Sequence, residues 1–214
     1  IFVTLKTFIM KYTKLFFLAI FCSIFSGLTT AQEAAVEKLN QQLQHRLDVL
    51  QKQIDDLMWH ERVGDIAYID KVYIYGPPPA NIPNPAAKGA NNPVKFWTYI
   101  FLPSDLEEGK KYPLIVLPHG GVHGDFTTYY THIVRELIAQ QYIVAAPEYR
   151  GSTGYGEAFY KQIDYGGKEN DDVLACRNYM VEAYEMVDPK RVGIMGWSHG
   201  GMISLFNIFE HPDA

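Results

Sequence analysis

The chain has 214 residues, of which 48% are hydrophobic and 14% aromatic, and its formal net charge at pH 7 is −5. This length and composition fit one globular domain with a substantial core, and they exclude a chain that is disordered throughout. The acidic balance also makes nucleic acid a poor partner, because binding to phosphates requires a surplus of lysine and arginine.

The first 31 residues have the layout of a secretory signal peptide. Met10 is followed by two lysines, by an apolar run over residues 15–25, and then by small or polar residues up to Ala31. We expect translation to start at Met10, with residues 1–9 upstream of it, and cleavage after Ala31, so that the protein is exported to a periplasmic or extracellular location. A membrane anchor is the less favoured alternative, because the apolar run is short for a bilayer, and no stable membrane insertion is expected after cleavage.

Cleavage at this point would make the exported part more acidic. It removes three lysines and no acidic residue, so the net charge becomes −8. Cys176 is then the one remaining cysteine, and no disulfide within the chain is expected. Stability must therefore come from the hydrophobic core.

Residues 33–62 predict a long amphipathic helix. Their apolar side chains recur every three or four positions, with charged residues and glutamines between them. They are Val36, Leu39, Leu43, Leu47, Leu50, Ile54, Leu57 and Met58. Either the helix packs on the surface of the following domain, or its narrow apolar stripe binds another helix, which would allow self-association through residues 33–62.

A strand-rich segment follows the helix. Residues 66–75 are rich in β-branched and aromatic side chains and predict a strand, and the prolines, glycines and asparagines of residues 76–93 predict a loop. Residues 94–102 and 113–118 predict two further strands, joined by a turn near residues 107–110. We expect these strands to form an antiparallel start connected by hairpins.

Strands and helices then alternate, which is typical of the α/β class. The expected elements are a helix over 129–140, a strand over 142–146, a helix over 171–186, a strand over 192–195 and a helix over 202–209. This alternation predicts a mainly parallel sheet with helices on both faces. We therefore divide the chain into residues 1–31 (upstream residues and signal peptide), 32–62 (amphipathic helix) and 63–214 (an α/β catalytic domain).

A serine motif lies between the last predicted strand and helix. Residues 196–200 read Gly-Trp-Ser-His-Gly, the Gly-x-Ser-x-Gly pattern of a nucleophile on a sharp strand-to-helix turn. The two glycines are required there because the strained turn leaves no room for larger side chains. We predict that Ser198 is a catalytic nucleophile, and that the backbone N–H of His199 helps to stabilise the oxyanion.

Two other segments are expected at the same edge of the sheet. Ligands of such sheets bind beyond the carboxyl ends of the strands. The segments at residues 119–121 (His-Gly-Gly) and 148–151 (Glu-Tyr-Arg-Gly) follow predicted strands, as Ser198 does. Three parts of the chain should therefore meet around one site.

These segments resemble the catalytic domain of the prolyl oligopeptidase family of serine peptidases over residues 94–214. The matching blocks are residues 117–124, 145–156, 169–173, 187–194 and 196–201. The resemblance implies an α/β-hydrolase fold that is incomplete at its C-terminus. Two features depart from many family members: residues 32–93 are too few for a β-propeller, and Val122 stands where many relatives have proline.

The resemblance also suggests roles for individual residues. It implies that Gly121 supplies the second oxyanion N–H, although a plain turn at the strand exit would also explain these glycines. The candidate substrate-side residues are His119, Gly120, Tyr149, Arg150 and Trp197. An alternative for Arg150 is an ion pair that holds its loop.

The sequence does not supply an obvious base for Ser198. In α/β-hydrolases the acid and then the histidine follow the serine in the chain. We expect both beyond Ala214, and therefore no useful catalysis from residues 1–214 alone. Neither His119 nor His199 is the expected base, and Asp171 and Asp172 are expected to cap a helix.

The predicted function is that of an exported serine hydrolase that cleaves peptide bonds through an acyl-enzyme. The substrate would be a peptide or a small ester, since a carboxylesterase of the same fold would use the same serine and oxyanion hole. No cofactor is implied, and the histidine spacing does not indicate a metal site. A non-catalytic binding protein that keeps the fold is the alternative from another class.

Overall fold

A computed structural model describes the backbone of residues 2–214 and the side chains of residues 32–214. It divides into two units, Ile1–Gln44 and His45–Ala214. The predicted signal peptide falls on residues 1–31, outside the described side chains. In residues 32–214, no helix is long and apolar enough to cross a membrane.

The predicted amphipathic helix is present as part of a longer one. Helix α1 runs over Phe2–Val63, so it begins well before the predicted residue 33. Within the larger unit, α1 packs on the sheet through the buried side chains of Trp59 and Val63. A buried Lys52 lies on the same side.

The apolar stripe of α1 is not the face that packs. Within the larger unit, four of its members are 56% to 74% exposed and Met58 is half-buried; the four are Leu47, Leu50, Ile54 and Leu57. The periodicity correctly predicted a helix, but packing on the domain uses the opposite, more polar side.

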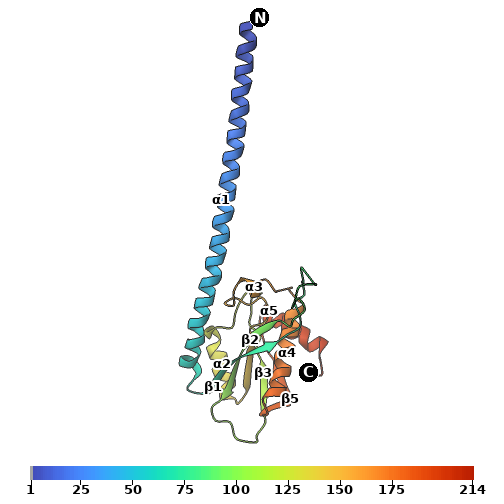
Figure 1. Cartoon of the computed structure of the whole chain (residues 1–214). Helices are drawn as coiled ribbons and strands as arrows, with labels where there is room; N and C mark the ends of the chain where they lie inside the picture. Colours follow the sequence, from blue (N-terminus) through green and yellow to red (C-terminus); the bar gives the residue numbers. More distant parts are fainter. Residues whose placement is uncertain (1) are drawn as a thin grey trace. The chain divides into compact units, whose positions relative to one another are not determined.

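Five strands form one mixed sheet in the described chain, in the order β1-β2-β4-β3-β5 (Figure 1). They are β1 (Ala67–Tyr75), β2 (Lys95–Pro103), β3 (Tyr112–Val116), β4 (Ile143–Pro147) and β5 (Val187–Ile194). Strands β1, β2 and β4 pair antiparallel, whereas β3 pairs in parallel with both β4 and β5. The predicted α/β class is thus confirmed in a mixed sheet, and the antiparallel start is confirmed for β1 and β2.

One expected connection is wrong. Strands β2 and β3 do not form a hairpin, because β4 lies between them and pairs with both. The side chains of β4 are all buried, and β3 has parallel partners on both edges. Apolar strands of this kind are most stable in the centre of a sheet, covered on both faces.

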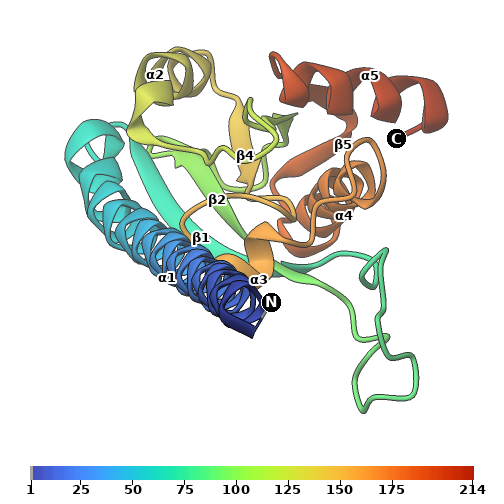
Figure 2. The same cartoon turned by 90° about the horizontal axis from the view of Figure 1, so that it is seen from above.

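Helices cover both faces of the sheet (Figure 2). On one face lie the end of α1, a 3₁₀ turn η1 (Thr128–Tyr130) and α2 (Thr131–Ala139), which share a core with β2 and β4. On the other face lie α4 (Lys168–Ala183) and α5 (His199–Glu210). A short helix α3 (Glu157–Tyr160) was not predicted.

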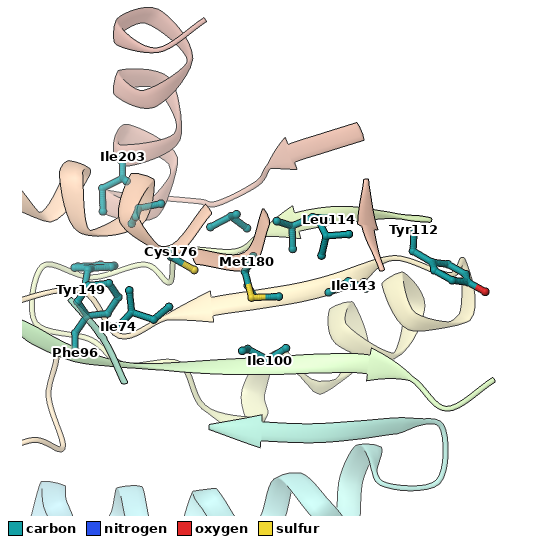
Figure 3. Packing of buried hydrophobic residues seen from close by; sticks show 14 residues of the cluster. Ile74, Phe96, Ile100, Tyr112, Leu114, Ile143, Tyr149, Cys176, Met180 and Ile203 are labelled. Atoms are coloured by element: carbon teal, nitrogen blue, oxygen red, sulfur yellow. The ribbon is translucent and has the colours of Figure 1, made fainter. Parts of the chain in front are cut away.

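The core beneath α4 and α5 is apolar and continuous. Ile100, Leu114 and Ile143 from three neighbouring strands meet Cys176 and Met180 of α4 (Figure 3). Cys176 is a free thiol, and burial raises its pKa to about 12. The thiol is therefore a packing group, because thiolate is the reactive form.

Candidate active site

Ser198 stands on a strained turn between β5 and α5. Its backbone has φ 54° and ψ −125°, a left-handed conformation that non-glycine residues rarely adopt. Its side chain is exposed, and it lies directly before the first residue of α5. This is the strained strand-to-helix geometry that the Gly-x-Ser-x-Gly motif predicts.

The two motif glycines allow the turn to pack closely. A Cβ added to Gly196 would lie 2.5 Å from the carbonyl oxygen of Gly200, and one added to Gly200 would lie 2.3 Å from that of Pro118. Side chains at either position would collide with backbone, which cannot move aside cheaply. The turn therefore packs directly against the segment that begins at Pro118.

That segment is the His-Gly-Gly loop, which we define as residues 119–126. Gly121 has φ +82°, and a Cβ on Gly120 would lie 3.1 Å from the carbonyl oxygen of Trp197. The Tyr149 hydroxyl lies 3.0 Å from the carbonyl oxygens of both His119 and Gly121, to which it can donate. The loop thus lies against the residue that precedes Ser198, as the convergence of segments predicted.

The backbone N–H groups of His199 and Gly121 are the predicted donors of an oxyanion hole. Within the described chain, the N–H of Gly121 makes no hydrogen bond. His199 is the first residue of α5, where backbone N–H groups have no partner inside the helix. The helix dipole adds a partial positive charge at this end.

His119 is fully buried, and both of its ring nitrogens have polar neighbours. Its Nε2 lies 2.9 Å from the Ser152 hydroxyl and its Nδ1 lies 3.1 Å from the carbonyl oxygen of Gly120. The ring stacks on Tyr149 with the centroids 4.3 Å apart. These contacts hold the loop in place and occupy both ring nitrogens.

His199 points into the protein. The side chain is 3% exposed, and its Nε2 lies 3.3 Å from Oε1 of the buried Glu169. Burial lowers the pKa of His199, although the Glu169 carboxylate acts in the opposite direction. The neutral imidazole is therefore favoured, and the backbone N–H of His199 is the group that remains near Ser198.

Arg150, expected on the substrate side, is instead fully buried in an ion pair with Asp172. Its Nε and Nη2 each lie 2.8 Å from a carboxylate oxygen, and its Nη groups also donate to the carbonyls of Pro77 and Pro78. Arg150 therefore ties its loop to α4 and to the loop after β1. Asp172 is not a helix cap, because its carboxylate is used by Arg150.

The other candidate substrate-side residues differ in exposure. Tyr149 is fully buried, whereas Trp197 is 36% exposed and its ring lies 4.6 Å from that of Tyr130. The Tyr130 hydroxyl accepts a hydrogen bond from the N–H of Gly120. Trp197 is therefore the member of this set whose side chain reaches the surface beside Ser198.

Sequence reasoning missed a buried charged cluster behind the His-Gly-Gly loop. Lys52 of α1 contacts Glu148 and Asp125. No local pattern marked Lys52, which lies among polar residues on α1, and in the segment 148–151 the predicted site residues were Tyr149 and Arg150 rather than Glu148. Contacts between segments so far apart in the sequence leave no periodic signal.

Within the described side chains, the Ser198 hydroxyl makes no hydrogen bond. No group of three or more histidine, cysteine, aspartate or glutamate side chains in residues 32–214 is arranged to hold a metal ion. The site thus presents an exposed serine on a strained turn, packed against a loop that carries the predicted donor Gly121. This arrangement can stabilise the negative charge of a tetrahedral intermediate.

Comparison with known proteins finds similarity to peptidases. Residues 128–214 match the sequence profile of the prolyl oligopeptidase family of peptidases. The chain is 37% identical over 108 residues to the uncharacterized peptidase YuxL of Bacillus subtilis, which covers 50% of this chain and 16% of the relative. It is 30% identical over 167 residues to an acylamino-acid-releasing enzyme of Arabidopsis thaliana, covering 73% of this chain and 22% of the relative.

Solved structures show the same fold. An acylaminoacyl peptidase in complex with a chloromethyl ketone aligns with TM-score 0.56 at 21% identity, over 70% of this chain and 23% of that chain. A puromycin-hydrolyzing peptidase of Mycobacterium tuberculosis aligns with TM-score 0.57 at 24% identity, over 69% and 21%. The chain thus has a partial α/β-hydrolase fold, and it spans about a fifth of the length of these proteins.

Proposed function

Residues 128–214 are part of a prolyl oligopeptidase family domain, and we propose that the protein is a serine hydrolase that cleaves amide bonds through an acyl-enzyme at Ser198. The observation that carries this proposal is the geometry of Ser198. It is an exposed serine at φ 54° whose flanking glycines pack against the loop that bears Gly121. A strained, exposed serine beside free backbone donors is the arrangement that nucleophilic attack on a carbonyl requires.

The oxyanion would accept hydrogen bonds from the N–H groups of His199 and Gly121. Ser198 attacks the carbonyl carbon, its proton passes to a base, and the amine leaves to give the acyl-enzyme. We propose that the base and its orienting acid follow Ala214 in the full-length protein, in the order acid then histidine. Residues 32–214 alone are then expected to give no turnover.

The substrate class follows from the relatives. Proteins similar to this chain include acylamino-acid-releasing enzymes and dipeptidyl peptidases. We therefore propose peptides, or peptide-like amides with a blocked N-terminus, as substrates. A carboxylesterase is the alternative, because esters would use the same serine and donors.

The full-length protein provides the test. A fluorophosphonate probe should label Ser198, and the protein should hydrolyse acyl-aminoacyl amides. Ester turnover without amide turnover would favour the esterase, and a full-length protein whose Ser198 is not labelled would leave the non-catalytic binding protein as the better account.

We also propose export, on the basis of the signal-peptide pattern over residues 10–31. The measurement is the N-terminal sequence of the protein recovered from outside the cytoplasm. It should begin at Gln32. A mature protein retained in the cytoplasm with residues 10–31 intact would contradict export.

A second candidate function, self-association, is favoured by the exposed stripe of α1. Val36, Leu43, Leu50 and Leu57 follow one another every seven residues, and Leu47 and Ile54 form a second row. This spacing is typical of a coiled-coil seam. The partner that fits best is a second copy of the chain. The residues beside the seam include three uncharged glutamines, which would not repel the same residues of another copy; they are Gln44, Gln51 and Gln53.

Sedimentation of the full-length protein tests this second candidate. We expect a dimer that dissociates in the double variant Leu47→Glu with Leu50→Glu, whereas Gln41→Lys, an exposed position on the opposite side of α1, should disturb it much less. A protein that is monomeric at all concentrations would contradict self-association.

A further inference from the structure

A buried lysine links the N-terminal helix to the His-Gly-Gly loop. Lys52 of α1 is 2% exposed, and its Nζ donates to the carbonyl oxygen of Phe126 at 2.5 Å. The same ammonium lies 2.5 Å from Glu148 and 3.2 Å from Asp125. All three of its oxygen partners thus belong to the loop or to the strand end beside it.

Glu148 continues this connection. Its carboxylate oxygens accept hydrogen bonds from the N–H of Phe126 at 3.1 and 3.2 Å, and one of them lies 3.4 Å from Nε2 of His119. Glu148 therefore contacts the loop at its first residue and at its last. Gly121, the proposed oxyanion donor, lies between these two points.

The charge of Lys52 stabilises the buried carboxylate of Glu148. Burial alone raises the pKa of Glu148, but the Lys52 ammonium and the neighbouring His119 lower it to about 2. Without Lys52, the loop would pack on a buried carboxylate that has lost its nearest cation. Removing one partner of a buried pair is costly because the other charge is left uncompensated.

A second lysine provides a contrast. Lys71 of β1 also reaches a carboxylate of α1, with its Nζ 2.7 Å from Asp56. Lys71 is less buried than Lys52, and its hydrogen bonds do not include the His-Gly-Gly loop. The two lysines therefore tie α1 to the domain in similar ways, but only Lys52 is bonded to the loop.

We propose that Lys52 is a positioning residue for the oxyanion hole, acting through Glu148 and Phe126 to hold the loop that carries Gly121. This inference rests on the proposed function. The α1 helix then serves catalysis directly, since it supplies the charge that sets the loop. Displacing a donor by a fraction of an ångström weakens stabilisation of the transition state more than binding of the substrate.

The experiment compares Lys52→Met with Lys71→Met in the full-length protein, using amide turnover and the rate of fluorophosphonate labelling of Ser198. We expect Lys52→Met to lower kcat by roughly tenfold to a hundredfold with little change in KM, because misplaced groups typically have effects of this size. Lys71→Met should leave kcat within about twofold. Equal effects of the two variants on kcat would overturn the inference.

A double variant separates positioning from stability. Lys52→Met with Glu148→Gln removes both charges, so the melting temperature should recover relative to Lys52→Met, while kcat stays low because Phe126 and Asp125 have lost the ammonium. Recovery of kcat together with the melting temperature would show a purely structural role. A wild-type protein without labelling of Ser198 would overturn the proposed function and this inference with it, whereas a labelled wild type with an unaffected Lys52→Met would overturn this inference alone.

Discussion

The His-Gly-Gly loop and the turn that carries Ser198 lie against each other, but their polar side chains differ in how they are satisfied. In the loop and beside it, His119, Tyr149 and Glu148 are fully buried and bonded to neighbours. The Ser198 hydroxyl is exposed and makes no hydrogen bond within the described side chains. Fixed donors for an oxyanion must be held before the reaction begins, whereas the nucleophile must remain free to reach the substrate.

The largest expected effect comes from removing the free hydroxyl. Ser198→Ala should lower turnover of the full-length protein by about four to six orders of magnitude and abolish fluorophosphonate labelling, because no covalent intermediate can form. The fold should be unaffected, since the side chain is exposed.

Ser204→Ala is the matched control for this change. Ser204 lies in α5 and donates only to the carbonyl oxygen of Gly200. It should keep labelling and most of the activity. Labelling that persists in Ser198→Ala would place the nucleophile elsewhere.

The contact between the His-Gly-Gly loop and the Ser198 turn can be broken by a substitution at Gly200. Gly200→Ala would place a Cβ 2.3 Å from the carbonyl oxygen of Pro118, so the loop and the turn must separate. We expect a loss of roughly 2–4 kcal/mol in the free energy of unfolding, measured by chemical denaturation, together with slower labelling of Ser198.

Gly201→Ala is the neighbouring control. Its added Cβ would come no closer than 3.3 Å to other atoms, and alanine favours the helix. A Gly200→Ala protein as stable as Gly201→Ala would mean that the two regions do not pack as described.

The buried charge behind the loop predicts an effect that appears only as the pH falls. The pKa of Glu148 is about 2 in the folded protein against 4.5 as its ordinary value. A lowered pKa contributes stability that is complete above pH 4.5 and is lost as the pH falls towards 2. The advantage of the wild type over Glu148→Gln in the free energy of unfolding should therefore shrink by on the order of 3 kcal/mol across this window.

Denaturation at a series of pH values checks this prediction. Asp65→Asn provides the comparison, because Asp65 is a solvent-exposed carboxylate whose pKa is lowered by a hydrogen bond from Arg135. Its pH dependence should be much weaker, since water screens the pair. A constant difference between wild type and Glu148→Gln from pH 5 to pH 2 would contradict a charged, paired Glu148.

The sequence predicted those parts of the molecule that depend on local patterns. The apolar runs of β3 and β4 identified buried strands, and the spacing of glycines around Ser198 predicted the strained turn. The same patterns did not show that β4 separates β2 from β3, because strand order depends on how whole faces pack.

The electrostatic support of the site was not predictable in the same way. Lys52 and Glu148 belong to segments far apart in the chain, and a polar residue on a helix is normally expected in water. For the apolar stripe of α1, the sequence predicted the helix but not which of its sides packs on the domain. Its periodicity specified a helix, yet it did not specify that the polar side would face the domain.

The central claim is that a free serine hydroxyl lies beside backbone donors that the loop holds in place. Its most direct test is a crystal structure of the full-length protein after reaction with a fluorophosphonate. The account predicts a phosphorus atom bonded to Ser198 Oγ, with its free oxygen about 2.7–3.1 Å from the backbone nitrogens of Gly121 and His199. The loop should keep its contacts with Lys52 and Glu148. An oxygen that points away from both nitrogens, or an unmodified Ser198, would contradict it.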